Sequence, residues 1–190
     1  MKTFIESIRH IHPVSDEGIQ LLMQNLQEVS YRKGKFLIKE NGNNRNIFFM
    51  KEGFARAFVI RDNKEFTLWF VQPFEPITTT LGTIAHPRSG VNVQLVEEST
   101  LLMISRKKME ELFLQSLELA NWGRKFTDKF LLGTEDFFTK DLCTNASERY
   151  QRLVTEYPEL LQKASLKHLA SYLLVTPESL SRIRGKLKSR

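Results

Sequence analysis

Cysteine is nearly absent from this sequence, because Cys143 is the only one among 190 residues. A single cysteine excludes a disulfide within the chain. It also excludes an iron–sulfur cluster, which needs about four cysteine ligands, and a cysteine-rich zinc site. No apolar run reaches membrane-spanning length, so no membrane segment is expected. The amino terminus lacks the basic start and apolar core of a signal peptide, which predicts a cytoplasmic location.

Histidine is also scarce, with four in the chain. His10 and His12 form a pair without a third ligand at suitable spacing, and we interpret them as surface residues. Only His86 lies in the region of predicted strands. A cupin-type metalloenzyme needs clustered His and Glu ligands on barrel strands, so it is the less favoured alternative. We therefore predict no metal site, no catalytic residues and no enzymatic activity.

The positive charge is unevenly distributed. The chain carries a formal net charge of +6, and from Lys140 onward there are ten basic and five acidic residues. Five of the six excess positive charges therefore lie in the last quarter of the chain. Such a concentration is what a phosphate-binding surface requires.

The same region contains a helical hairpin pattern between Ser165 and Arg184. Apolar residues at helical spacing predict a first helix over 166–173. A second helix is predicted to start at Thr176, a good N-cap, followed by Pro177 at the first helical position and Glu178 in the first turn. Its predicted inner face is Leu180, Ile183 and Leu187, and its outer face is Ser179, Ser181, Arg182 and Lys186. This pattern is typical of a DNA-binding helix-turn-helix, and an ordinary amphipathic hairpin is the alternative.

The rest of the chain changes its periodicity twice. Residues 1–31 are predicted to be helical, with a helix starting at Ser15 and Val29 closing its apolar stripe. Between residues 31 and 105, short β-type runs bounded by turn clusters predict an antiparallel barrel or jelly roll. The predicted strands are 35–39, 46–51, 54–61, 66–71, 91–96 and 100–105. Gly34 and Gly53 mark turns where a positive φ is expected.

Helical periodicity returns after residue 106. A short helix over 107–113 precedes a long one over 116–138, and Asn145 with Glu148 predicts the start of the next helix. An apolar seam on the long helix predicts a two-fold dimer interface, and packing on the chain's own barrel is the alternative. The predicted interface residues are Leu119, Trp122, Phe126, Phe130 and Phe137. We expect a sensor domain over 1–115, a dimerisation helix and hinge over 116–140, and a DNA-binding domain over 141–190.

This order of elements resembles the Crp/Fnr family of bacterial transcription regulators. The most specific likeness is Thr176-Pro-Glu-Ser-Leu-Ser-Arg-Ile-Arg. Arg32-Lys-Gly-Lys and Phe49-Met-Lys-Glu-Gly-Phe resemble the family's barrel turns. The resemblance implies an α+β fold: an antiparallel, jelly-roll-like β-roll with flanking helices, a long dimerisation helix and a winged helix-turn-helix. It also implies a homodimeric regulator with double-stranded DNA and RNA polymerase as partners.

By this likeness, Glu178 and Arg182 occupy positions that read base edges, which suits their chemistry, because Arg pairs with guanine and Glu accepts from cytosine. Pro177 stands where the catabolite-activator branch has another Arg, so that branch's operator sequence does not carry over. Leu174 stands where a turn Gly is usual. The expected phosphate contacts are Ser165, Lys167, Thr176 and Ser179, and Pro177 and Lys186 complete the predicted interface.

The effector site departs from the family pattern. Cyclic-nucleotide-binding members carry a Gly-Glu pair where this chain has Phe74 to Leu81, and Pro76 there has no N–H to donate. Arg88-Ser89-Gly90 resembles the phosphate motif but is one residue out of register. A cyclic nucleotide is therefore not expected, whereas another small effector, or none, is. The candidate effector residues are Thr78, Thr79, Arg88 and Ser89. A ligand-binding or protein-interaction module without DNA binding is the remaining alternative.

Overall fold

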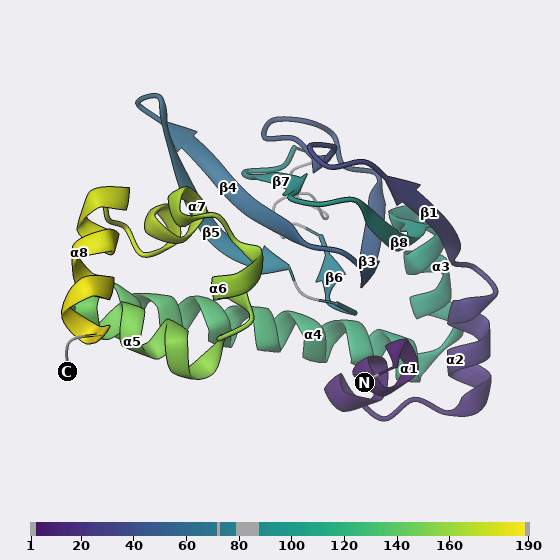
Figure 1. The fold of residues 1–190 in the computed structure, drawn as a ribbon. Coiled ribbons are helices and arrows are strands. Elements are labelled where there is room, and N and C mark those ends of the chain that lie inside the picture. Colours follow the sequence, from purple (N-terminus) through teal and green to yellow (C-terminus); the bar gives the residue numbers. More distant parts are fainter. Residues whose placement is uncertain (1–2, 72, 79–87, 189–190) are drawn as a thin grey trace.

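The computed structural model describes residues 3–71, 73–78 and 88–188 of the chain. A β-roll lies above a long helix, short helices gather at the amino-terminal end of that helix, and a helical unit sits at its other end (Figure 1). The strands are β1 (Gln27–Tyr31), β2 (Phe36–Ile38), β3 (Asn46–Glu52), β4 (Ala55–Arg61), β5 (Lys64–Val71), β6 (Pro76–Ile77), β7 (Asn92–Leu95) and β8 (Ser99–Ser105). The helices are α1 (Phe4–Ile11), α2 (Asp16–Met23), α3 (Arg106–Gln115), α4 (Leu117–Asp136), α5 (Ala146–Glu156), α6 (Leu160–Lys163), α7 (Leu166–Tyr172) and α8 (Pro177–Lys188).

The roll consists of two four-stranded sheets, β1-β8-β3-β6 and β2-β7-β4-β5, whose paired strands are antiparallel. Apolar side chains from both sheets fill the space between them, among them Ile38, Met50, Ala57, Val93 and Leu101. Each of the six predicted strands is present, so the α+β class with an antiparallel β-roll is confirmed. The described residues after β8 contain no strand, and a wing therefore does not lie in the described part of the chain.

The prediction that residues 1–31 are helical is wrong at its end. Helix α2 stops at Met23, and residues 27–31 form β1, which pairs with β8. Val29 packs against the roll interior instead of closing a helical stripe. The spacing of three residues between Leu26 and Val29 imitates helical periodicity, and the pairing with β8 overrides it.

The glycines expected at positive φ adopt it, with φ of +85° at Gly34 and +114° at Gly53. Gly53 also lies tightly against β8. A Cβ at this position would stand 2.1 Å from Oγ of Ser99 and 2.8 Å from its Cα. The turn between β3 and β4 therefore requires glycine for both its backbone angle and its space.

The amino-terminal helices close one end of the roll together with α3 and the start of α4. Thr3 and Glu6 form a capping box at α1, and Ser15 caps α2 as predicted. Ile8, Leu22, Phe49 and Trp122 are buried in the core that these elements share. This core attaches the first half of α4 to the roll.

The prediction that Leu119 and Trp122 belong to a dimer interface needs correction for this reason. Leu119 is 0% exposed and Trp122 is 3% exposed, so the chain buries both residues itself. The Trp122 ring lies 6.1 Å from that of Phe49 and stacks on Phe126 at 5.9 Å, and the Phe130 ring meets Trp69 edge-on at 5.7 Å. Leu119, Trp122 and Phe130 therefore face the chain's own roll and the core that it shares with the amino-terminal helices, whereas the places of Phe126 and Phe137 in a dimer interface stay predictions.

The helical unit begins after a π-helix at Phe137–Asp141 and contains α5 to α8. The predicted Asn145–Glu148 capping box is present at the start of α5. The core of this unit includes Leu153, Leu169 and Leu180, and it also takes in Phe54 and Phe70 from the roll. The roll and the helical unit therefore share one core.

Candidate nucleic-acid interface

Helix α8 starts as its sequence predicts. The backbone N–H of Ser179 donates to Oγ1 of Thr176 at 3.2 Å, which makes Thr176 the N-cap. Leu180 is fully buried, and Ile183 and Leu187 pack against the same core. The inner face of α8 is therefore the predicted one, and it attaches the helix to α5 and α7.

A tight turn joins α7 to α8. Leu174 adopts φ of +57°, and the N–H of Val175 donates to the carbonyl of Ala170 at 3.0 Å. A left-handed residue at this point is the usual end of a helix, although glycine normally supplies it. The turn thus keeps its geometry with a leucine in the glycine position.

The outer face of α8 is polar and open to solvent. Glu178, Ser181, Arg182 and Lys186 are exposed, and Ser179 is half-buried. The Thr176 hydroxyl donates to Oγ of Ser179 at 3.2 Å, and Nη2 of Arg182 donates to the same Oγ at 3.1 Å. This short chain of hydrogen bonds holds the Arg182 guanidinium over the first turn of the helix.

Glu178 and Arg182 both carry charge at neutral pH. Its own backbone N–H is the largest cause that holds the pKa of Glu178 below its ordinary value, and the nearby Thr176 side chain and the charge of Arg182 add to the effect. A hydrogen-bond acceptor and a bidentate donor therefore lie one helical turn apart on one exposed face.

The predicted contacts on α7 lie at its amino-terminal end. Ser165 caps the helix, since its Oγ accepts the N–H of His168 at 3.2 Å. Ser165 and Lys167 are both exposed. Helix α7 and helix α8 thus present exposed polar or basic side chains in their first turns, where the helix dipole favours an anion.

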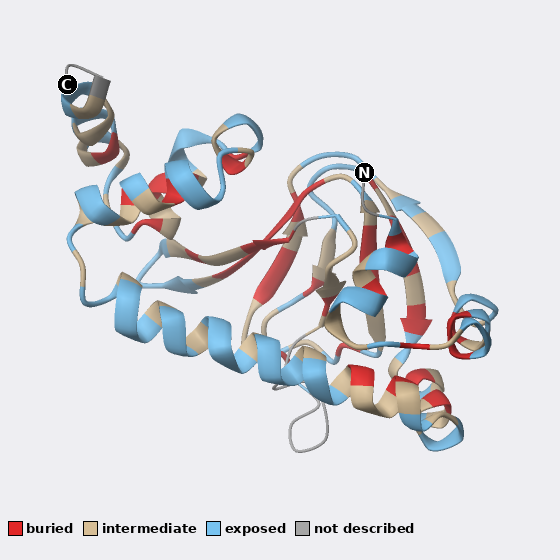
Figure 2. Cartoon of the chain, turned by 90° about the horizontal axis from the view of Figure 1, so that it is seen from below, coloured by how far each residue is buried: buried red, intermediate tan, exposed pale blue. Residues whose placement is uncertain are grey.

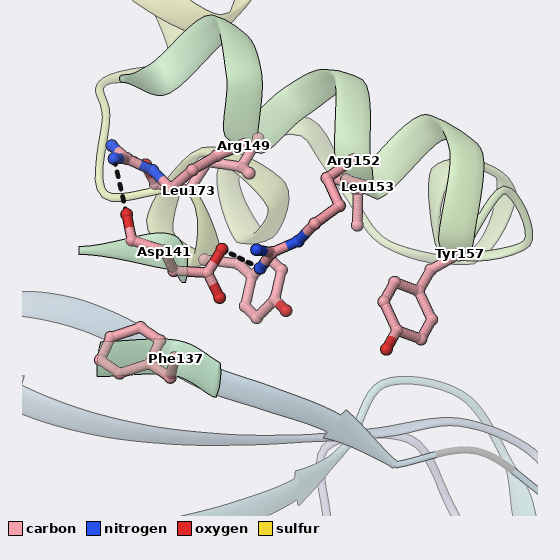
Figure 3. A pocket seen from close by; sticks show the side chains of 8 residues that line it. Phe137, Asp141, Arg149, Arg152, Leu153, Tyr157 and Leu173 are labelled. Atoms are coloured by element: carbon pink, nitrogen blue, oxygen red, sulfur yellow. Dashed lines mark hydrogen bonds and ion pairs between the residues drawn. The ribbon is translucent and has the colours of Figure 1, made fainter. Parts of the chain in front are cut away.

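Between the π-helix, α5 and α7 lies a small hollow (Figure 3). Its two arginines are occupied within the chain. Arg149 donates to the carbonyls of Asp141 and Leu173, and Arg152 forms an ion pair with the Asp141 carboxylate. Burial raises the pKa of Tyr172, which also lines the hollow, to about 12. The hollow has a volume of about 10 Å³, which leaves room for roughly one water molecule. The contacts of these two arginines join the π-helix to the helical unit.

Of the candidate effector residues, Thr78, Arg88 and Ser89 lie in the described part of the chain, and each has a different environment. Oγ1 of Thr78 accepts from Nη2 of Arg106 at 2.8 Å. Ser89 is 1% exposed, and its hydroxyl both donates to the carbonyl of Val91 and accepts the N–H of Val91. Arg88 is exposed and pairs by its backbone with Asn43. Thr79 lies outside the described residues.

A second apolar surface, which the sequence did not predict, lies on α4 and on the hinge, the segment from the π-helix to Leu142. Seen from below in Figure 2, most of the face of α4 that points away from the roll is exposed. Leu131 and Leu132 are 59% and 62% exposed, and Phe138 and Leu142 are also open to solvent. Leu131 and Phe138 lie seven residues apart, a signal that the stronger aromatic periodicity of the buried seam concealed.

Comparison with known proteins agrees with this architecture. A family model described as a cyclic nucleotide-binding domain matches residues 28–116. FixK2 from Bradyrhizobium japonicum is similar in structure with a TM-score of 0.74 and 18% identity, over 86% of this chain and 85% of that one. A Crp/Fnr family regulator from Eubacterium rectale gives a TM-score of 0.73 and 14% identity, over 93% and 84%. The chain has the Crp/Fnr fold.

A third structure with this fold is the c-di-GMP responsive global regulator CLP of Xanthomonas campestris. Its TM-score is 0.71 with 15% identity, over 92% of each chain. No curated protein sequence is significantly similar to this chain. The neighbours from Xanthomonas campestris and Eubacterium rectale are regulators by name. No group of three or more metal-ligating side chains occurs within residues 3–71, 73–78 and 88–188. In the same described ranges, no helix is both long and apolar enough to cross a membrane.

Proposed function

We propose that this protein is a homodimeric transcription regulator that binds double-stranded DNA through α7 and α8. The observation that carries the proposal is the exposed face of α8, where Glu178 and Arg182 stand one turn apart and Ser179 positions the arginine. An arginine held in this way suits a bidentate contact with guanine, and a glutamate suits the amino group of cytosine. Ser165, Lys167, Thr176 and Lys186 are the proposed phosphate contacts.

Dimerisation would place two such faces on DNA. In a two-fold dimer the recognition helices enter successive major grooves about 34 Å apart, so the operator is expected to be a pseudo-palindrome. The exposed side of α4 and the hinge suits this contact, because Leu131, Leu132, Phe138 and Leu142 are apolar and open to solvent. These four residues replace Leu119 and Trp122 in the proposed interface, while Phe126, Phe130 and Phe137 lie beside it.

The roll would act as the sensor. The candidate residues Thr78 and Ser89 have hydrogen-bond partners within the chain, and apolar side chains fill the space between the sheets. A small effector other than a cyclic nucleotide, or a regulator without an effector, fits these observations better than the cyclic nucleotide that the domain's family name suggests. RNA polymerase is the expected protein partner, and the cytoplasm the expected location.

Selection of duplexes from a random pool, repeated across a salt series, tests the proposal. The protein should enrich a two-fold-related sequence, with affinity that falls steeply as salt rises. Arg182→Ala should cost roughly 1–3 kcal/mol on the selected site and relax one base position in each half-site. Lys186→Gln should instead weaken binding to every sequence and lower the salt slope by about one.

Arg9→Ala is the matched control, because Arg9 lies on α1 at the opposite end of α4 from α8 (Figure 1). This variant should bind like the parent protein. If Arg182→Ala weakened specific and random duplexes equally, Arg182 would not read a base. If no sequence were enriched at any salt concentration, the regulator proposal would give way to a module without DNA binding.

A further inference from the structure

Helix α7 attaches the helical unit to the edge of the roll. Strand β5 is the last strand of its sheet, so one side of its backbone has no neighbouring strand among the described residues. The Ser171 hydroxyl takes that place: it accepts the N–H of Thr67 at 2.8 Å and donates to the carbonyl of Glu65 at 2.7 Å. One side chain therefore pairs with a donor and an acceptor two residues apart, as a further strand would.

A partly buried ion pair adjoins this contact. Arg56 of β4 is 2% exposed, and its Nη2 lies 2.6 Å from Oε2 of Glu65. Its Nη1 donates to Oγ1 of Thr67 at 3.3 Å, and its guanidinium lies 4.1 Å from the centre of the Phe58 ring. A buried arginine needs such partners, and removing one of them would be costly. We call Ser171, its partners Glu65 and Thr67, and Arg56, which binds both of those partners, the edge latch.

His168 stands next to the edge latch. It lies three residues before Ser171 on α7, and therefore on the same side of the helix. Its ring is half-buried, and its Nδ1 is enclosed with no hydrogen-bond partner among the described residues. The charged groups around it are Arg56 from β4, Glu65 from β5, its neighbour Lys167 and Lys33 from the turn after β1.

This setting favours the neutral ring. With the proton on Nε2, the enclosed Nδ1 is a bare acceptor, whereas protonation would create an N–H there without a partner. Protonation would also add a cation to a group that already holds three cations and one carboxylate. Burial lowers the pKa of His168, Arg56 lowers it further, and Glu65 opposes them.

Any movement of the helical unit relative to the roll would have to open this contact. Phe70 packs on Tyr172 at 5.5 Å and stacks on Phe54 at 5.4 Å, so aromatic packing accompanies the hydrogen bonds. The π-helix at Phe137–Asp141 lies between α4 and the helical unit, and helices often bend at such a segment. The edge latch thus decides whether the unit stays in one pose or moves at the hinge.

We propose that the edge latch holds the helical unit on the roll in one pose, and that protonation of His168 opens it. The latch is closed well above the ordinary histidine pKa of about 6.5, where the ring is neutral in both states. As the pH falls below that value, the open state takes up a proton more readily than the closed state. The equilibrium constant for closing the latch therefore falls by up to tenfold per pH unit, until the pH passes the lowered pKa of His168 in the closed state.

Amide hydrogen exchange by NMR on the whole chain tests this directly, because the Thr67 amide donates to Ser171. Protection of Thr67, corrected for the intrinsic pH dependence of exchange, should be constant above about pH 7 and fall by up to tenfold per pH unit below about 6.5. Amides of β3 and β8 serve as the internal reference and should stay protected. In His168→Gln, protection of Thr67 should not depend on pH, whereas His10→Gln should behave like the parent protein.

Ser171→Ala should lose protection of Thr67 at every pH, with β3 and β8 unchanged. The proposal is wrong if the parent protein shows constant protection of Thr67 down to about pH 5.5, a range in which a solvent-exposed histidine would titrate fully. It is also wrong if His168→Gln keeps the pH dependence, or if Thr67 stays protected in Ser171→Ala. The readout needs neither DNA nor effector, so it does not depend on the proposed function.

Discussion

Helix α4 has two apolar faces, and substitutions on them should separate folding from dimerisation. We compare Trp122→Ala on the side facing the roll with the double variant Leu131→Asp/Leu132→Asp on the outer side. Trp122 is 3% exposed and lies among Phe49 and Phe126. Leu131 and Leu132 are 59% and 62% exposed.

The expected magnitudes differ in kind. Truncating a buried tryptophan to alanine costs about 3–5 kcal/mol of the free energy of unfolding. Replacing the two leucines by aspartate should lower the free energy of unfolding of the monomer by only about 1 kcal/mol, mainly because aspartate has a lower helix propensity. In a dimer that buries them, each leucine contributes roughly 1 kcal/mol or more, so the four leucines of two chains contribute about 4 kcal/mol. That corresponds to roughly three powers of ten in the dimer Kd.

Denaturant unfolding and sedimentation over a range of chain concentrations measure the two quantities separately, because dimerisation itself adds concentration-dependent stability. The aspartate variant should sediment as a folded monomer and lose binding to a two-fold operator, while keeping the exchange protection of β3 and β8. Trp122→Ala should unfold at lower denaturant and still dimerise when folded. A stable, monomeric Trp122→Ala together with a dimeric aspartate variant would refute the assignment of the two faces and restore the aromatic seam as the interface.

Two further predictions concern the backbone. Gly53→Ala should lower the free energy of unfolding by about 2 kcal/mol or more, because its Cβ would meet Ser99 at 2.1 Å and φ is +114°. Gly34→Ala is the matched comparison, since its φ is +85° but its Cβ would meet nothing within 4 Å. Thermal unfolding should show a clearly smaller loss of stability for this variant. Leu174→Gly should be more stable than Leu174→Ala by about 1 kcal/mol in denaturant unfolding, since both lose the side chain and only glycine relieves the φ of +57°; equal stabilities would mean that the turn has a different backbone conformation.

Local signals in the sequence were sufficient where neighbouring residues determine the structure. The Asn145–Glu148 capping box, the Thr176 N-cap and the inner face of α8 depend on residues within a few positions of one another. The alternation of strands and turns likewise predicted the roll, and the turn glycine at residue 53 was expected at positive φ. In each case the periodicity or the cap is itself the physical cause of the element.

Features that depend on residues distant in the sequence were predicted wrongly or not at all. The spacing of Val29 predicted that it continues a helical stripe, whereas in the structure it belongs to a strand that pairs with β8. Trp122 belonged to a plausible dimer seam, and the amino-terminal helices, more than a hundred residues away, determine that it is buried within the chain. The exposed residues Leu131, Leu132, Phe138 and Leu142 could not be distinguished from buried ones by spacing alone.

The sequence by itself determined the order of elements apart from β1 and β6. It also determined the start of the second helix of the hairpin and the side of that helix that carries Glu178 and Arg182, because helical periodicity and capping are local. Only the tertiary structure decided which side of α4 is free. It also decided that Ser171, 104 positions from Thr67 in the chain, completes the edge of β5. Such contacts arise when separate elements pack, and the pattern of a single segment contains no information about the surface against which it packs.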